Sequence, residues 1–191
     1  METKRCAWVN PENELYVRYH DEEWGRPVYN DEVLFEFLIL EWAQAGLSWE
    51  TVLKKRENYR KVFHHFDVQK CSALTDWELE KILLDERIIR NRLKVFSVRK
   101  NALIFWTIQK EFGSFSKYLW NFVWAKQIIN TPKTLKEVSA KTELSDKISK
   151  DLKKRGMSFV GSTIIYAYLQ AVGMVDDHIV DCFCKSILKH K

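Results

Sequence analysis

The sequence predicts an all-α protein. Its 191 residues include only three prolines and six glycines, so few positions interrupt a helix. Ala, Leu, Lys, Glu and Ile dominate several long stretches, and 46% hydrophobic with 30% charged residues is ordinary for a folded chain with a buried core. No repeat, low-complexity tract or Gly/Ser-rich linker marks a domain boundary. We therefore expect one two-lobed helical domain over residues 1–191.

The N-terminal thirty residues carry turn signals at 10–11 and 25–27 and are expected to be irregular. A helix should then begin at Asn30 or Asp31, which are good N-cap residues, and end at Gly46, which suits a left-handed C-terminus. Its sequence, DEVLFEFLILEWAQAG, is apolar nearly all round. This pattern predicts a helix buried in the middle of the fold.

Capping residues place the helices that follow. Ser48 can cap a helix that ends near Phe63, and Thr75 with Glu78 has the capping-box spacing for a helix that ends near Leu84. A long helix is expected over about 91–111, closed by Gly113, and the aromatic segment FSKYLWNFVW follows it. The chain then breaks at 131–132. The last helices are expected near 134–139, 142–155 and 162–173, with Gly173 as the terminator.

The segment KKRGMSFVGST, residues 153–163, joins the last two of these helices. Gly156 suits a helix C-terminus with positive φ, Phe159 and Val160 should point inward, and Gly161 leaves room for a close partner. The segment fits a tight turn between helices. It also fits a phosphate site, because free N–H groups at a helix N-terminus attract anions. In such a site the N–H groups of Ser162, Thr163 and Ile164 would bind the phosphate, and the basic residues Lys153, Lys154 and Arg155 would reinforce the attraction.

The net charge of +5 arises from 31 basic and 26 acidic residues, with basic clusters at 54–61, 90–100 and 150–155. Each cluster fits a solvated helix face, and the three together also fit a surface that binds a polyanion. No apolar run approaches the roughly 18 residues that a membrane helix needs, and the start METKRCAWVN lacks the apolar core of a signal peptide. We expect a cytosolic protein without a membrane partner.

Glu41 is a carboxylate flanked by apolar residues within the helix predicted to be buried. An ionised group there is costly unless a partner compensates it. The residues alone allow either a structural hydrogen bond to a backbone amide or a role in binding.

Eight tryptophans are many for this length, and Trp8, Trp24 and Trp49 stand in segments without helical periodicity. Such rings fit core packing, and in a basic protein they also fit stacking on nucleic-acid bases.

Four cysteines in a cytosolic chain argue against a disulfide framework and leave metal binding or inert burial. His178 and Cys182 are four residues apart and would share one face of a helix, while Cys6 and His20 are ligand-type residues near the other terminus. Cys71 has no obvious partner.

Several blocks of the chain, in order, resemble 3-methyladenine DNA glycosylase I, the constitutive, zinc-containing branch of the helix-hairpin-helix glycosylases. The resemblance covers nearly the whole chain and is most specific in its N-terminal half. It rests on the blocks CAWV, ELYVRYHDEEWGRPVYND, LFEFLILEWAQAGLSWETVLKKRENYR, IIRNRLKV and LKKRGMSFVGSTIIYAYLQAVGMVDDHIVDC.

The resemblance implies a monofunctional, monomeric enzyme that flips 3-methyladenine out of alkylated double-stranded DNA. Hydrolysis of the N-glycosidic bond would leave an abasic site and free 3-methyladenine. No lysine nucleophile is implied, so excision should not cut the strand. The implied fold has its helix-hairpin-helix at about 142–173 and a structural zinc that joins the two chain ends.

The resemblance also implies roles for individual residues. Glu41 would contact the extruded base, Leu47 would fill the gap left in the duplex, and the hairpin residues would bind DNA. The aromatic residues implied at the base pocket or its rim are Tyr19, Trp49, Trp8 and Trp24, and the implied Zn²⁺ ligands are Cys6, His20, His178 and Cys182.

Two positions stay open. Cys184 is a rival of Cys182 as ligand. Asp176 stands where many related glycosylases carry a catalytic aspartate, but we favour a role in orienting the zinc-binding turn. Two other functions remain as alternatives: a zinc-stabilised module that binds DNA without cutting it, and a broader alkylpurine glycosylase that uses Asp176.

Overall fold

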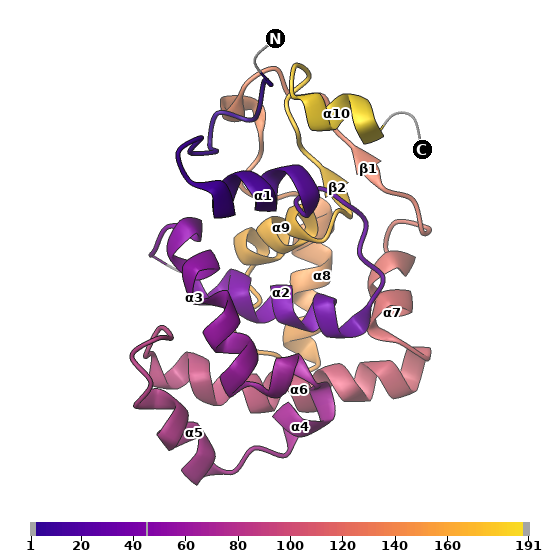
Figure 1. Ribbon diagram of the computed structural model, residues 1–191. Coiled ribbons are helices and arrows are strands. Elements are labelled where there is room, and N and C mark those ends of the chain that lie inside the picture. The colour runs from indigo at the N-terminus through magenta and orange to yellow at the C-terminus, as the bar shows by residue number, and fades with distance from the viewer. Residues whose placement is uncertain (1–2, 45, 189–191) are drawn as a thin grey trace.

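The computed structural model describes residues 3–44 and 46–188, and this part of the chain is mostly helical, as predicted (Figure 1). The elements of the first half are α1 Glu14–Glu22, α2 Asp31–Ala43, α3 Trp49–Val62, η1 His64–Phe66, α4 Val68–Ser72, α5 Asp76–Leu83 and α6 Arg92–Phe112. Those of the second half are α7 Phe115–Asn121, β1 Ile128–Ile129, η2 Leu135–Glu137, α8 Glu143–Lys154, α9 Ser162–Ala171, β2 Val175–Asp176 and α10 Phe183–Leu188.

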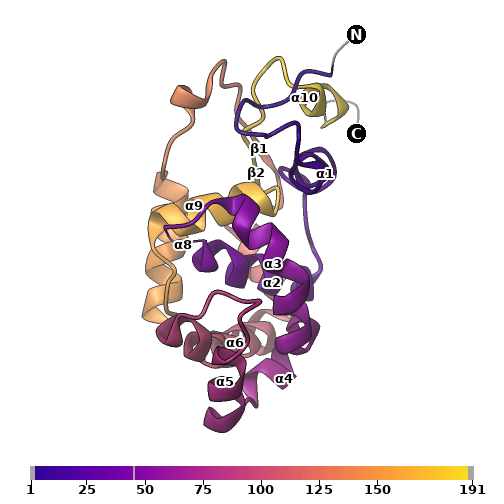
Figure 2. The same cartoon turned by 60° about the vertical axis from the view of Figure 1, so that its left-hand side comes forward.

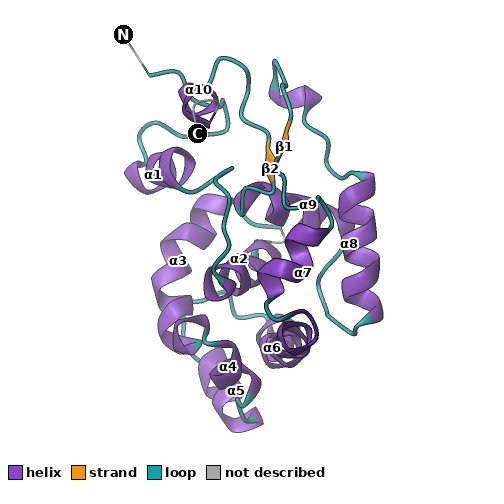
Figure 3. Cartoon of the chain, turned by 90° about the vertical axis from the view of Figure 1, so that its right-hand side faces the viewer, coloured by secondary structure: helices purple, strands orange, loops and turns teal. Residues whose placement is uncertain are grey.

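The predicted central helix is α2, which packs against α3, α6, α7 and α9 (Figure 3). Every residue from Leu34 to Ala43 is buried. Asn30 caps the helix by accepting a hydrogen bond from the Val33 N–H. The helix ends at Ala43 rather than at Gly46, which adopts a positive φ of 82° in the turn that follows. Residue 45 of the expected helix lies outside the described part of the chain.

The expected caps are present. The Ser48 side chain accepts from the Thr51 N–H at the start of α3, and Thr75 forms a reciprocal capping box with Glu78 at the start of α5. Gly113 closes α6 in the left-handed conformation, with φ 84°. These local signals place three helix ends to within one or two residues of the prediction.

The prediction of an irregular N-terminus is wrong, because α1 occupies Glu14–Glu22 behind the Asn13 cap. Only Tyr19 and His20 of this helix are fully buried, with Leu15 and Tyr16 partly buried against the core. This apolar stripe is short, and the prediction followed the turn signals at 10–11 and 25–27 on either side of it. The helices α4 and α10 are also additions, as is α7 within the aromatic segment FSKYLWNFVW. The helix expected near 134–139 is a single 3₁₀ turn.

A short parallel pair of strands, β1 and β2, adds to the expected all-helical fold. Ile128 pairs with Val175 and Ile129 with Asp176. Two residues per strand are too few for an alternating pattern to mark them in a sequence. The pair fixes the chain as it leaves α9, immediately before His178.

The segment predicted as a hairpin is formed by α8, a tight loop and α9. Gly156 has the expected positive φ of 99°. The Asn101 side chain on α6 holds the loop by donating to the Ser158 carbonyl and accepting from the Ser158 N–H, at 3.0 and 2.9 Å. Val160 is buried, Phe159 is half-buried, and a Cβ built on Gly161 would meet nothing within 4 Å. Gly161 therefore leaves open space in front of α9.

The two terminal segments lie together at one pole of the molecule (Figure 1). The Phe183 N–H donates to the Lys4 carbonyl at 3.0 Å, and Lys4 pairs with Asp181 at 2.6 Å. Among the helices of residues 3–44 and 46–188, none is long and apolar enough to cross a membrane.

Candidate functional site

A cavity of about 290 Å³ opens beside α9. In Figure 2 the orange segment that contains η2 rises on one side of α9, and α1 lies on the other. The residues that line the cavity are Trp8, Tyr16, Tyr19, Trp24, Glu41, Gln44, Trp49, Leu135, Val138, Ala167, Gln170 and Asp177. The structure thus brings together all five residues that the sequence placed at a base pocket. Tyr16, Gln44, Gln170 and Asp177 were missed.

Aromatic rings form much of the cavity wall. Tyr19 and Trp49 lie 5.3 Å apart between ring centroids, and Trp8 meets Trp24 edge to face at 5.1 Å. The indole N–H of Trp49 is buried and has no hydrogen-bond partner among the described residues. Tyr16 stands one helical turn before Tyr19, so the helical period would have identified it had α1 been predicted. These rings can enclose a flat molecule of purine size.

Glu41 supplies the carboxylate of the cavity and is only 5% exposed. No hydrogen bond or ion pair joins its side chain to another residue in the described part of the chain, which excludes the structural bond to a backbone amide there. Burial away from water disfavours the charged form and raises the pKa of Glu41 to about 8. The carboxyl group can therefore change its charge near neutral pH.

Glu36, on the same helix, is also buried, but unlike Glu41 it is paired with arginine side chains. Arg56 and Arg60 donate to its oxygens at 2.8 and 2.7 Å, and Arg56 also binds Glu23 at the end of α1, at 2.7 Å. Burial raises the pKa of Glu36, but these hydrogen bonds outweigh it and hold the pKa below its ordinary value. The first basic cluster of the sequence is thus partly used inside the protein.

Glu41→Gln is expected to stabilise the protein, and more so at high pH. Between pH 4.5 and about 8 the folded protein keeps a proton that the unfolded chain releases, so the free energy of unfolding falls as pH rises across this window. Because the pKa moves from 4.5 to about 8, the ionised Glu41 lowers the free energy of unfolding of the wild type by roughly 5 kcal/mol above pH 8. The variant does not have this loss. Urea unfolding at pH 5, 7 and 9 measures the difference. A constant difference between wild type and variant would contradict the buried, unpaired carboxyl.

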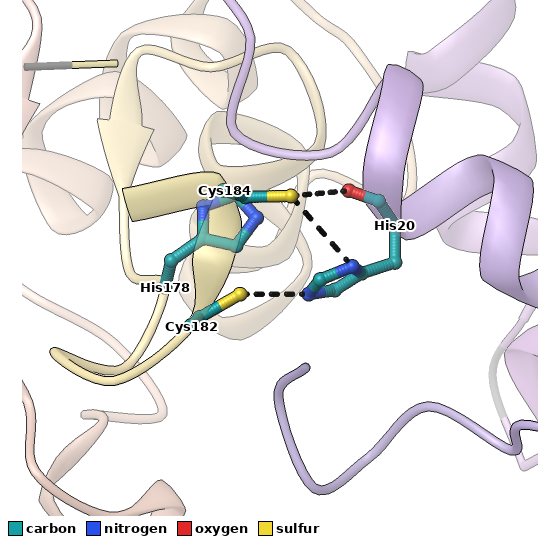
Figure 4. A group of neighbouring side chains, drawn as sticks. All are labelled: His20, His178, Cys182 and Cys184. Atoms are coloured by element: carbon teal, nitrogen blue, oxygen red, sulfur yellow. Dashed lines mark hydrogen bonds between the residues drawn. The ribbon is translucent and has the colours of Figure 1, made fainter. Parts of the chain in front are cut away.

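A cluster of metal-ligand side chains lies beside this cavity. The donor atoms of His20, His178, Cys182 and Cys184 all lie within 4.8 Å of one another, and the four side chains point toward one centre (Figure 4). His178 and Cys182 do not lie on one helix, so they meet without the shared helix face that their spacing would allow. Cys182 follows a turn instead, in which its N–H donates to the Ile179 carbonyl.

The surroundings of the two histidines fit a metal. His178 Nδ1 lies 2.8 Å from an Asp176 oxygen, and its Nε2 is buried without a partner in the described part of the chain. His20 Nδ1 lies 2.7 Å from Asp21. A carboxylate on one ring nitrogen is the usual support for a histidine that binds metal through the other.

The cysteines depart in part from the expected ligand set. Cys184 belongs to the closest group and Cys6 does not, although Cys6 is buried beside it. The Cys6 thiol contacts Cys182, and its N–H faces His20 Nε2 at 3.4 Å. Hydrogen bonds from the Cys184 and Cys6 thiols lower the pKa of Cys182, which favours the thiolate that metals bind. Cys71 is buried elsewhere, with its thiol on the Phe63 carbonyl.

A family model described as methyladenine glycosylase matches residues 8–185. The chain belongs to this family. The DNA-3-methyladenine glycosylase of Haemophilus influenzae is 46% identical over 96% of this chain and 99% of its own length. DNA-3-methyladenine glycosylase 1 of Escherichia coli K12 is 45% identical over 95% of this chain and 96% of its own. The resemblance to 3-methyladenine DNA glycosylase I seen in the sequence is confirmed.

Solved structures agree with this assignment. A crystal structure of a 3-methyladenine DNA glycosylase I has a TM-score of 0.90 with 44% identity, and covers 95% of this chain and 99% of its own. The Staphylococcus aureus enzyme, in a structure on the basis of 3-methyladenine recognition, has a TM-score of 0.91 with 33% identity, and covers 95% and 96%.

Asp176 faces the histidine cluster in this member of the methyladenine glycosylase family. It is fully buried, and its oxygens lie 2.8 Å from His178 Nδ1 and 2.9 Å from Lys185 Nζ. Asp177, not Asp176, lines the aromatic cavity. These contacts suit the orienting role that we favoured for Asp176.

The residues expected at a DNA interface lie at two places, the turn between α2 and α3 and the connection between α8 and α9 with the helix ends beside it. Leu47 is 42% exposed before α3, and Lys153 and Lys154 are exposed at the end of α8. Arg155 is held in ion pairs with Glu111 and Asp151. Ser162 and Thr163 open α9, whose N-terminus has no side-chain cap.

Proposed function

We propose that this chain excises 3-methyladenine from alkylated double-stranded DNA by hydrolysing the N-glycosidic bond, which leaves an abasic site and the free base. The observation that carries this proposal is the unpaired, buried carboxyl group of Glu41 inside an aromatic cavity. Membership of the methyladenine glycosylase family supports it. The proposal includes action as a cytosolic monomer.

The chemistry of the lesion explains the form of the cavity. A base in a duplex must leave the stack before its glycosidic bond can be reached. N3-methylation makes adenine cationic, so the base leaves readily and the enzyme needs recognition more than strong acid catalysis. Tyr19 and Trp49 would stack on the electron-poor ring, with Trp8 and Trp24 at the rim. Glu41 would lose its proton and pair with the cation, while water attacks the sugar carbon.

The proposed DNA surface combines an apolar wedge with a helical hairpin. Leu47 would enter the duplex where the nucleotide has left. The uncapped N–H groups at Ser162 and Thr163 would bind a phosphate, with Lys153 and Lys154 nearby. Arg155 would act through its ion pairs, which brace the hairpin against α6. We assign α8 and α9 to a helix-hairpin-helix on this basis.

The cluster of histidines and cysteines would hold a structural Zn²⁺. His20, His178 and Cys182 would be three ligands, and Cys184 or Cys6 the fourth. Zinc with four protein ligands has no open position for substrate and contributes stability instead. Its ligands would join α1 to the C-terminal segment, so the metal would fix the wall of the cavity that carries Trp24.

The proposed function is tested with DNA that carries radioactive methyl groups. The purified protein should release 3-methyladenine, identified by chromatography, and the strand should stay intact until alkali cleaves the abasic sites. Binding of abasic DNA without base release would identify a binding module instead. Release of 7-methylguanine that Asp176→Asn abolishes would identify the broader enzyme. Either result overturns the proposal.

A further inference from the structure

Two cavity residues that the mechanism does not use form a hydrogen-bonded pair. Gln170 stands in the last turn of α9, and Asp177 follows β2. The Gln170 Nε2 donates to Asp177 Oδ2 at 2.6 Å, and both side chains line the aromatic cavity with Glu41.

Asp177 is held rigidly on its other sides. The Tyr166 hydroxyl donates to Oδ2 at 2.7 Å, and the Asn130 amide donates to Oδ1 at 2.7 Å. Asp177 is 2% exposed, and each of its oxygens accepts at least one hydrogen bond. Donors therefore surround a carboxylate that acts only as an acceptor.

This arrangement fixes the orientation of the Gln170 amide. A glutamine side chain has similar shape in its two flipped forms, and only its hydrogen bonds distinguish them. Because the Asp177 carboxylate accepts, the NH₂ group of Gln170 must face it. The Gln170 Oε1 is then left without a hydrogen bond to any residue of the described chain, and it is not sealed from the surface. The cavity thus holds an oriented, unused acceptor.

We propose that Gln170 is a specificity-determining residue, oriented by Asp177, whose Oε1 accepts a hydrogen bond from the 6-amino group of the extruded base. The inference rests on the proposed function and deepens it. Adenine carries an amino donor at position 6, and guanine carries a carbonyl acceptor there. An acceptor in the pocket would favour 3-methyladenine and repel the carbonyl of 3-methylguanine, although methylation at N3 gives both bases a positive charge.

The test is the ratio of 3-methyladenine to 3-methylguanine that the purified protein releases from DNA methylated with dimethyl sulfate. Gln170→Met keeps an unbranched side chain but removes both polar groups. It should lower the rate of 3-methyladenine release roughly tenfold, which is the effect of one lost hydrogen bond in a closed site. The rate for 3-methylguanine should stay the same or rise.

Asp177→Asn tests the orientation. An asparagine can donate to Gln170 Oε1, so the Gln170 amide can turn its NH₂ group toward the cavity. The ratio should fall as in Gln170→Met, and adding Asp177→Asn to Gln170→Met should change it less than about twofold. Zinc content is measured in parallel, because Asp177 precedes His178. If the Asp177 variant does not fold, the Gln170 variant decides the proposal alone.

Gln109 offers a matched control. It donates its Nε2 to Asp31 at 2.7 Å, away from the cavity. Gln109→Met loses the same kind of bond and should leave the ratio unchanged.

The possible outcomes distinguish failure of the specificity role of Gln170 from failure of the proposed function. A folded Gln170→Met protein with the wild-type ratio would overturn the specificity role, even if wild type releases 3-methyladenine. A wild-type protein that releases neither base would overturn the proposed function itself.

Discussion

Glu41→Gln should lower kcat/KM for 3-methyladenine release by about 100- to 1000-fold. An amide has the shape of the protonated carboxyl but cannot ionise to pair with a cationic base. Loss of one partner of a buried charge pair, or of one preorganised polar group in an active site, typically has an effect of about this size. Single-turnover release from methylated DNA measures the effect. Glu32→Gln, an exposed change on the same helix, should have none.

The same variant should lose its pH dependence. Because the pKa of Glu41 is about 8, the wild-type rate should rise from pH 6 to 9 as the carboxylate forms. Burial raises the pKa of Tyr16 and Tyr19, so these cavity residues stay neutral over that range. The rate of Glu41→Gln should be flat. Equal slopes for the two proteins would show that another group carries the pH dependence.

Removal of the proposed zinc should destabilise the fold by about 5 kcal/mol or more, since structural sites contribute their binding energy to folding. Without the metal, the described parts of the terminal segments keep the buried cluster of Cys6 and Ile179 and the bond between Phe183 and Lys4. They also keep the Lys4–Asp181 ion pair, whose side chains are about 60% exposed and contribute little. Urea unfolding with and without a strong chelator measures the loss, together with the bound zinc per chain.

Cysteine variants test the ligand set of the proposed zinc. Cys182→Ser should abolish binding. Of Cys6→Ser and Cys184→Ser, the one that removes the fourth ligand should lower the affinity sharply, and the other should keep one zinc per chain. Cys71 is buried elsewhere, where its thiol donates to the Phe63 carbonyl. Cys71→Ser is therefore the control and should retain the metal. A chelated protein that unfolds at the same urea concentration as the untreated one would exclude a structural metal.

Local chemistry explains which parts of the fold were predictable. Ser48 and Gly113 act within their own helix ends, so the sequence alone shows them. Helix α1 is different, because Tyr19 and His20 are buried by elements distant in the chain. Its local signals are only the Asn13 cap and the spacing of Tyr16 and Tyr19, so the burial of the helix does not follow from its own sequence.

The candidate site divides in the same way. Glu41 was found because a carboxylate among apolar residues is unusual within a single helix. Gln170 and Asp177 were not, since their bond depends on how the chain turns after α9. The choice between Cys6 and Cys184 likewise depends on tertiary distances that spacing does not contain.

The ion pairs of Arg56 affect how much of the free energy of DNA binding is needed to form the cavity. From α3 it binds Glu36 on α2 and Glu23 at the end of α1, so one side chain ties together three helices whose residues surround Glu41. The receptacle for the damaged base is thereby assembled in advance and requires little ordering when the nucleotide arrives. More of the free energy of binding to the duplex is then available to unstack and unpair the damaged nucleotide.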